Sequence, residues 1–238
     1  DQDKSRTIGI SKKNLDFFNK KILNINKFLW NINRIQIYSD NLINEKILDF
    51  QNKNHSLFAI FKNYQIHQHL LSTLKKNKLC VIRKNNDYKR LNIKDYNLII
   101  NCDGENKISK KFFFKKIKKK YNSFAHTTII KHEKINNDIA SQVFTKKGPL
   151  AFLPLSKTET SIVYSVAGNQ NIDLKKLVEK YNRKYLKIRF GHSTSFELRS
   201  TSLRYYYYKN ILAFGDLLHR LHPLAGQGFN MSLRDIKD

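Results

Sequence analysis

Two short stretches of the sequence place glycine and an acidic residue directly after an apolar run. In "ILAFGDLLH" the run ends on Gly215 and Asp216, and in "YNLIINCDGEN" another run ends on Asp103 and Gly104. In an open α/β sheet, ligands bind beyond the carboxyl ends of the strands, where a carboxylate can accept a hydrogen bond from a sugar hydroxyl. Each pair taken alone is typical of a turn. Two such pairs in one chain fit a single long dinucleotide that is contacted at several points.

The segment after the first pair, "HPLAGQGFNMSLRD", concentrates residues that shape the backbone. It contains Pro223, Gly226 and Gly228, although the whole chain has only 8 glycines and 3 prolines. Glycine allows the main chain to approach a ligand without a Cβ in the way. The helix that we predict over 226–238 presents unpaired N–H groups and the positive end of its dipole at this point. Such a helix start suits an anion, or a ring oxygen that gains negative charge during a reaction.

Metal and disulfide chemistry are not indicated. His219 and His222 have i, i+3 spacing, but no cysteine, third histidine or acidic pattern completes a metal site, so we expect them to hydrogen-bond the loop or pack beside a ligand. Cys80 and Cys102 are the two cysteines of the chain and lack CxxC spacing. This usage is typical of the reducing cytosol. We therefore expect no metal site and a cytoplasmic protein.

The chain is strongly basic, with a formal net charge of +26 from 45 basic and 19 acidic residues. Such a charge raises nucleic acid or an anionic membrane surface as partners, and residues 110–124 and 203–209 mix basic and aromatic side chains as single-strand-binding proteins do. However, lysine is spread along the whole chain together with asparagine and isoleucine, which favours a compositional bias. We expect no specific nucleic acid. No apolar run approaches the ~20 residues that span a bilayer, so any membrane contact is expected to be peripheral.

The elements that must position these residues are of two kinds. Continuous apolar runs indicate buried strands of an α/β sheet, of which 96–102 is expected to be covered on both faces. Other regions indicate successive antiparallel strands, so we predict two domains, each built from discontinuous segments. One helix or a helix pair is predicted over 12–31, and single helices over 64–77, 173–186 and 226–238. Strands are predicted over 34–40, 56–62, 78–84, 96–102, 196–210 and 210–215 and within 121–167. Strands 96–102 and 210–215 should share one sheet, with Asp103 and Asp216 at the same edge.

The glycine-rich segment resembles the signature of the flavin-dependent aromatic monooxygenases of the p-hydroxybenzoate hydroxylase type, and within them the ubiquinone-biosynthesis hydroxylases. The family pattern is Gly-Asp-x-x-His-x-x-His-Pro-x-x-Gly-Gln-Gly-x-Asn. Further support comes from Asp103-Gly104, from "GPLAFLPL" before "SIVYSV", and from the opening "DKSRTIGIS". The residues that carry the match are Gly215-Asp216, His219, His222-Pro223, Ala225-Gly226-Gln227-Gly228, Asn230 and Arg234-Asp235.

The resemblance implies a fold class and an activity. The fold would be α/β, or α+β taken as a whole, with a discontinuous Rossmann-like FAD-binding domain formed by residues 1–15, 61–117 and 206–238. An antiparallel-sheet substrate domain would take 16–60 and 118–205. The implied activity is hydroxylation of the aromatic ring of a polyprenylated phenol in ubiquinone biosynthesis, with FAD as cofactor, NAD(P)H as co-substrate and O₂ as oxidant. The flavin carries the oxygen chemistry while the protein orients it and excludes water.

The resemblance also implies residue roles. Asp216 would bind the FAD ribitol, and Pro223 would border the face where oxygen adds. Asp103 and Gly104 would lie near the pyrophosphate and the passage used by NAD(P)H, and Arg6 near the flavin and its phosphates. No side chain is required as a catalytic acid or base. The implied cofactor-binding residues are Arg6, Asp103, Gly104, Gly215, Asp216, Pro223, Gly226, Gln227, Gly228 and Asn230.

Three departures from the family pattern accompany the match. No Gly-x-Gly-x-x-Gly turn is present, as expected if about thirty residues of a βαβ unit precede this sequence. Leu217 and Leu218 replace a small pair, and Lys107 and Lys110 follow the second acidic pair where the family has serine and arginine. A halogenase or a geranylgeranyl reductase is the alternative within the same superfamily, and the His-Pro-x-x-Gly-Gln-Gly form favours the hydroxylases. The expected partners are a prenylated phenol, membrane lipid on the inner face of the cytoplasmic membrane, and other proteins of ubiquinone biosynthesis.

Overall fold

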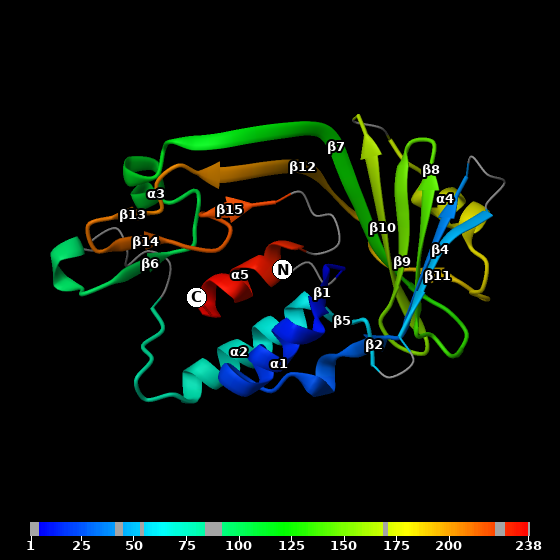
Figure 1. The fold of residues 1–238 in the computed structure, drawn as a ribbon, viewed down its shortest axis with the longest axis horizontal. Coiled ribbons are helices and arrows are strands. Elements are labelled where there is room, and N and C mark those ends of the chain that lie inside the picture. Colours follow the sequence, from blue (N-terminus) through cyan, green and yellow to red (C-terminus); the bar gives the residue numbers. More distant parts are fainter. Residues whose placement is uncertain are drawn as a thin grey trace. The chain divides into compact units, whose positions relative to one another are not determined.

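A computed structural model describes most of the chain, and its residues cluster into two compact units. Unit 1 comprises Asp1–Gln68 and Tyr121–Leu198, and unit 2 comprises His69–Lys120 and Arg199–Asp238. Figure 1 shows the mixture of helices and sheets that was predicted, so the α/β fold class is confirmed. Assignment of the segments to an FAD-binding and a substrate domain stays a prediction. The described residues are 5–40, 45–52, 55–83, 92–168, 171–221 and 227–237.

A large mixed sheet dominates unit 1 (Figure 1). Its neighbouring strands are antiparallel except for β3 and β8, which run parallel. The alternating pattern of β10 buries Ile162, Tyr164 and Val166 on one face, where α4 (Leu174–Tyr181) packs Leu174 and Val178 into the same core. In order, the strands are β7 (Lys116–Lys131), β10 (Glu159–Ala167), β9 (Gly148–Pro154), β8 (Ile139–Thr145), β3 (Arg34–Ser39) and β4 (Glu45–Gln51), and β11 (Arg189–Phe190) also pairs with β7.

A second, three-stranded sheet in unit 1 has the antiparallel order β1 (Thr7–Ser11), β5 (Phe58–Lys62) and β2 (Trp30–Ile32). Helix α1 (Lys12–Lys21) follows β1, and the Ser11 Oγ accepts the Asn14 N–H as its N-cap. Helix α2 (Asn63–Lys76) follows β5, as the sequence predicted.

In the region 12–31, where one helix or a helix pair was predicted, the α-helix α1 ends at Lys21. A group of asparagines terminates it. The Asn19 Oδ1 accepts the Ile25 N–H at 2.9 Å, and the Asn24 Oδ1 accepts the Asn26 N–H at 3.0 Å. Short amide side chains compete in this way with helical backbone bonds. The chain then makes a 3₁₀ turn at Asn26–Phe28 and enters β2.

Unit 2 contains a three-stranded sheet in the order β13 (Tyr207–Tyr208), β14 (Ile211–Ala213) and β6 (Ile99–Asn101). Strands β14 and β6 are parallel, whereas β13 and β14 form an antiparallel hairpin. Its core contains Phe113, Leu203, Ile211, Ala213 and Leu217. The remaining elements are a 3₁₀ turn at Ile93–Asp95, α3 (Lys107–Phe112), β15 (His219–Arg220), which pairs with β12 (Thr194–Leu203), and α5 (Gln227–Lys237).

Two strand predictions in unit 2 are wrong. Residues 78–83 form no strand, and Leu79 is 95% exposed; no strand of the described chain pairs with this segment. Its backbone bonds locally instead: the Cys80 N–H donates to the Asn77 carbonyl at 3.0 Å, and the Leu79 N–H donates to the Asn77 Oδ1 at 2.9 Å. Residue 84 lies outside the described ranges. Strand β6 is not covered on both faces, because Ile100 is 57% exposed. The strand predicted over 196–210 is divided between β12 and β13. No described helix is both long and apolar enough to cross a bilayer.

Candidate cofactor-binding site

The two acidic glycine turns follow neighbouring parallel strands. Ile211, Leu212 and Ala213 of β14 stand opposite Ile99, Ile100 and Asn101 of β6. The Phe214 N–H extends the pairing by donating to the Asn101 carbonyl at 2.9 Å. Because parallel strands end at the same edge, Asp103 and Asp216 follow strand ends that lie side by side. The prediction that these two strands share one sheet is confirmed.

The turn after β14 keeps the Asp216 side chain exposed. Gly215 has φ of +57°, a left-handed conformation that favours glycine, and its carbonyl accepts the His219 N–H at 3.1 Å. Leu217, 2% exposed, packs into the unit 2 core, so the leucine that departs from the family pattern anchors the turn. Within the described residues, the Asp216 carboxylate has neither a hydrogen-bond nor an ion-pair partner.

The turn after β6 is held by a small polar network. The Asp103 Oδ1 accepts the Glu105 N–H at 2.8 Å, and the Asn106 Oδ1 caps α3 by accepting the Ser109 N–H at 2.8 Å. Buried Asn101 donates to the Ser109 Oγ at 2.8 Å and accepts from the Asn106 side chain at 2.8 Å. Asn101 was not predicted from the sequence as a residue that positions the turn. Its place at the end of an apolar strand could have indicated this, because a buried asparagine needs hydrogen-bond partners.

Two further residues, a lysine and a cysteine, lie at this edge of the sheet. The Lys116 Nζ donates to the Gly104 carbonyl at 3.4 Å, which places a cation beside the second turn. Partial burial of the Cys102 thiol raises its pKa, and the nearby Asp216 carboxylate raises it further, so the reactive thiolate form is disfavoured. Lys116 was not predicted as a site residue from the sequence, because it is one of many lysines and lies on another strand.

Helix α5 begins at Gln227, and Gly228 and Asn230 lie in its first turns. The helix predicted here is confirmed. A Cβ placed on Gly228 would meet no atom of the described residues within 4 Å, and Gly228 has no positive φ. The His219 Nε2 lies 3.1 Å from the Asp235 Oδ2, so this pair connects β15 to the last turns of α5. His222, Pro223 and Gly226 lie outside the described residues.

Arg6 belongs to unit 1. It is exposed and directly precedes β1, and its carbonyl accepts the Asn63 N–H at 3.0 Å. Its predicted role beside the flavin stays a prediction. In the ranges that the structure describes, no group of three or more His, Cys, Asp or Glu side chains could hold a metal ion.

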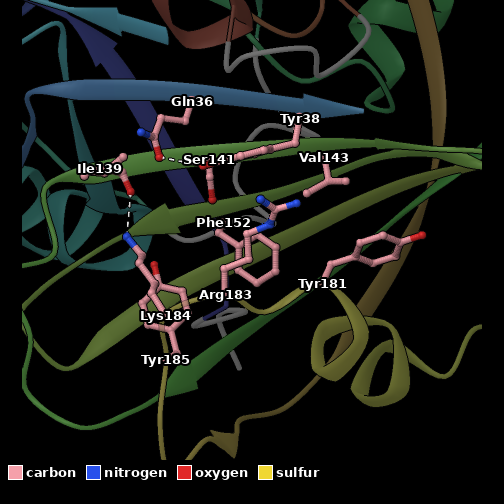
Figure 2. A pocket seen from close by; sticks show the side chains of 10 residues that line it. All are labelled: Gln36, Tyr38, Ile139, Ser141, Val143, Phe152, Tyr181, Arg183, Lys184 and Tyr185. Carbon is pink, nitrogen blue, oxygen red and sulfur yellow. Dashed lines mark hydrogen bonds between the residues drawn. The ribbon is translucent and has the colours of Figure 1, made fainter. Parts of the chain in front are cut away.

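Unit 1 also has a pocket of about 170 Å³ (Figure 2). Strands β3, β8 and β9 form one side of it, and the segment from Tyr181 to Tyr185 forms the other. The Lys184 Nζ donates to the Ile139 carbonyl at 3.0 Å, and burial lowers its pKa to about 8. The Arg183 guanidinium lies 4.0 Å from the centre of the Tyr38 ring. None of the predicted FAD-binding residues lines this pocket, so it is not the candidate cofactor site.

Sequence comparison relates the chain to three kinds of ubiquinone hydroxylase. It is 28% identical over 126 residues to ubiquinone hydroxylase UbiL of Rhodospirillum rubrum, covering 49% of this chain and 29% of that protein. It is 33% identical over 109 residues to 3-demethoxyubiquinol 3-hydroxylase of Escherichia coli, covering 42% and 28%. With the mitochondrial ubiquinone biosynthesis monooxygenase COQ6 of Xenopus tropicalis it shares 26% over 195 residues, covering 63% and 41%. No family model matches the chain. The chain spans less than half the length of these relatives.

Solved structures with the same fold are monooxygenases. The p-nitrophenol 4-monooxygenase PnpA of Pseudomonas putida superimposes with a TM-score of 0.75 at 12% identity, covering 98% of this chain and 68% of that one. PqsL of Pseudomonas aeruginosa, described as a probable FAD-dependent monooxygenase, gives 0.73 at 12% identity, covering 99% and 75%. Together with the sequence matches, these structures confirm the resemblance seen in the glycine-rich segment. The chain is therefore a sequence relative of the ubiquinone-biosynthesis hydroxylases and has the fold of the FAD-dependent aromatic monooxygenases.

Proposed function

We propose that the chain is part of an FAD- and NAD(P)H-dependent monooxygenase that hydroxylates the aromatic ring of a prenylated phenol in ubiquinone biosynthesis. The observation that carries this proposal is the parallel pairing of β6 with β14, which ends in Asp103-Gly104 on one strand and Gly215-Asp216 on the other. The relatives named above supply the substrate class. The sequence signature favours a hydroxylase over a halogenase or a reductase of the same superfamily.

The residues at this edge fit the ribitol and the pyrophosphate of FAD. The Asp216 carboxylate is exposed and forms no hydrogen bond or ion pair with a described residue. It can therefore accept a hydrogen bond from a donor such as a ribitol hydroxyl. A Cβ placed on Gly215 would meet no atom within 4 Å, so the backbone there is open to a ligand. The Lys116 ammonium beside Gly104 supplies the positive charge that a pyrophosphate needs.

In this proposal each part of the site has a separate task. Asp216 holds the ribitol, and Asp103, Gly104 and Lys116 form the pyrophosphate side. The first turn of α5 directs backbone N–H groups toward the pyrimidine edge of the ring, with Asn230 beside them. Pro223, Gly226 and Arg6 complete the predicted set. FAD, when bound, supplies the oxygen transfer, and the chain's own residues orient it and exclude water.

The proposed substrate indicates where in the cell the protein acts. A phenol with a prenyl tail partitions into a bilayer, so we expect peripheral contact with membrane lipid and with other proteins of ubiquinone biosynthesis. The expected location is the cytoplasm, on the inner face of the cytoplasmic membrane. No specific nucleic acid is part of the proposal.

The decisive experiment uses the complete protein that contains this chain. It should purify with FAD and couple NAD(P)H oxidation to hydroxylation of a short-chain prenylphenol. Asp216→Asn removes a charged hydrogen bond worth ~1.5 to 3 kcal/mol, so FAD should bind roughly 10- to 150-fold more weakly. Flavin absorbance per polypeptide and FAD titration measure this change.

Glu179→Gln is the matched control, because it removes one exposed carboxylate from α4 in unit 1. This variant should retain FAD. Normal FAD affinity in Asp216→Asn would refute the role of that residue. A complete protein that binds no flavin, or that oxidises NAD(P)H without hydroxylated product from any phenol, would refute the function.

A further inference from the structure

Two segments of unit 2 that are far apart in the sequence meet to form a basic and aromatic surface, which we call the Tyr-Lys surface. The Arg204 N–H donates to the Lys115 carbonyl at 3.1 Å. The Phe112 and Tyr208 rings stack at 4.4 Å between centroids. The surface consists of Lys111, Phe114, Lys115, Tyr205, Tyr206, Tyr207, Tyr208 and Lys209.

The hairpin of β13 and β14 places Tyr207 and Tyr208 on a strand at the edge of the unit 2 sheet. Tyr207 and Tyr208 pair with Leu212 and Ile211, and Lys209 makes the tight turn with φ of +51°. On β14 the pattern buries Ile211 at 1% exposure within the unit 2 core. Among the described strands of this sheet, β13 has β14 as its neighbour on one side and none on the other. Four consecutive tyrosines from Tyr205 onward are all exposed.

Exposure of these rings is large for aromatic side chains. Phe114 is 65% exposed, Tyr205 63%, Tyr206 54% and Tyr207 68%. Large aromatic side chains normally contribute their area to a core or to an interface. A cluster of solvent-exposed aromatic side chains therefore indicates a surface that binds a partner.

The charge of the same segments is entirely positive. Residues 107–120 contain eight lysines, and neither 106–132 nor 198–215 contains an aspartate or glutamate. The Lys115 Nζ lies 5.7 Å from the centre of the Tyr205 ring, and the Lys209 Nζ lies 5.7 Å from that of Tyr208. The partner must therefore be anionic and must also accept aromatic rings.

We propose that the Tyr-Lys surface docks the protein on an anionic phospholipid bilayer. Tyrosine is enriched at the interface between water and lipid, where its ring enters the headgroup layer and its hydroxyl stays wet. Lysines near the surface are attracted to anionic headgroups. Single-stranded nucleic acid fits less well, because base stacking needs open ring faces, and here Lys115, Lys209 and the Phe112 ring occupy faces of Tyr205 and Tyr208.

The docking itself does not depend on the proposed reaction. It deepens that proposal, because a docked enzyme could reach a prenylated substrate in the bilayer. A protein that binds vesicles but hydroxylates no phenol would refute only the function. A protein that hydroxylates a detergent-solubilised prenylphenol but ignores vesicles would refute only the docking.

The test measures co-sedimentation of the complete protein with unilamellar vesicles. We expect binding to vesicles of 70% phosphatidylcholine and 30% phosphatidylglycerol, and much weaker binding to pure phosphatidylcholine or in 0.5 M NaCl. A Lys111→Gln/Lys115→Gln double variant should bind roughly tenfold or more weakly. A Tyr205→Ser/Tyr207→Ser double variant should lose affinity by a similar factor, because it removes the interfacial rings.

The matched control is Lys175→Gln/Lys176→Gln, which removes the same charge from exposed positions of α4 in unit 1. It should bind vesicles like the wild type. All the changed side chains are exposed, so the thermal midpoint and FAD content should stay unchanged. Wild-type vesicle binding by both surface variants would overturn the proposal. Stronger binding to oligo-dT than to the anionic vesicles, lost in the same variants, would overturn it in favour of nucleic acid.

Discussion

Unit 1 and unit 2 differ in which part of the sequence determines their structure: the strands in unit 1, and the turns after the strands in unit 2. Unit 1 has a long sheet whose alternating strands bury one face against α4, and its core extends over four strands and that helix. Unit 2 has short strands of two or three residues in its small sheet, and most of its sequence signature lies in the turns that follow them. The scaffold of unit 1 follows from periodicity. The site proposed in unit 2 depends on single residues such as Gly215, Asp216 and Asn101.

This difference implies that core substitutions should affect unit 1 more than unit 2. Ile162 (0% exposed) lies in the unit 1 core and Ile211 (1% exposed) in the unit 2 core. Ile162→Ala should lower the free energy of unfolding by about 4 kcal/mol and Ile211→Ala by about 2, within the usual range for such truncations. Urea unfolding followed by Trp30, the single tryptophan and a unit 1 residue, would measure the first and far-UV circular dichroism both. Equal losses would contradict the comparison.

The two units should also differ in their response to alanine at glycines with positive φ. A Cβ on Gly148 in unit 1 would lie 1.9 Å from the Ser165 carbonyl oxygen, whereas one on Gly215 would meet nothing within 4 Å. Gly148→Ala adds a clash to strain and should cost roughly 3 kcal/mol or more. Gly215→Ala adds strain alone and should cost about 1 kcal/mol. Thermal unfolding of both variants tests this, and a larger loss for Gly215→Ala would show that the turn is more constrained than its surroundings indicate.

A substitution at Gly228 can distinguish an effect on folding stability from an effect on FAD binding. It lies in α5 without positive φ and with open space around it. Gly228→Ala should therefore stabilise the protein without FAD by about 0.5 to 1 kcal/mol, because alanine favours the helix. If the first turn of α5 touches the flavin, the same change should weaken FAD binding. The paired measurement is the thermal midpoint without FAD and an FAD titration. Higher stability with unchanged FAD affinity would remove Gly228 from the site.

The smallest expected effect is the pH dependence of unit 1. Burial lowers the pKa of His132, whose Nε2 lies 3.0 Å from the Thr160 Oγ1, and burial also lowers the pKa of His126. The folded state thus binds fewer protons than the unfolded state, so stability is complete above about pH 6.5 and falls as the pH drops below that value. Urea midpoints between pH 7.5 and 5 measure this slope. A His132→Gln variant should show a shallower slope, and an unchanged slope would exclude His132 as its source.

Much of the scaffold could be predicted from the sequence. The alternation in "TSIVYSV" and "ASQVFTKKGPLAFLPLS" predicted antiparallel strands that the structure contains as β10, β8 and β9. The helix predicted from residue 173 begins at Leu174, and Asp173 is its N-cap, accepting the Lys176 N–H at 3.1 Å. Local hydrogen bonds and side-chain periodicity determine such features, and both are visible in a short window of sequence.

Features that depend on distant partners were harder to predict. The run at 78–83 has strand-forming residues but pairs with no strand of the described residues, so its apolar pattern was misleading. Strand β4 went unrecognised, because all seven of its residues are exposed and lack a buried face. In the site, Asn101 and Lys116 gain their roles from contacts across turns and strands. The positions of the glycine and aspartate pairs at strand ends were predictable because each pair directly follows an apolar run.

The interleaving of the two units has a consequence for synthesis on the ribosome. Residue Ile211, which pairs with Ile99, is translated more than a hundred residues later. Until then the apolar strand β6 has no parallel partner, whereas the hairpins of β8, β9 and β10 can close soon after they emerge. Long-range parallel pairing of this kind is slow and exposes unpaired edges to aggregation. The nascent chain is therefore expected to engage holdase chaperones through residues 96–101 until the hairpin of β13 and β14 has left the exit tunnel.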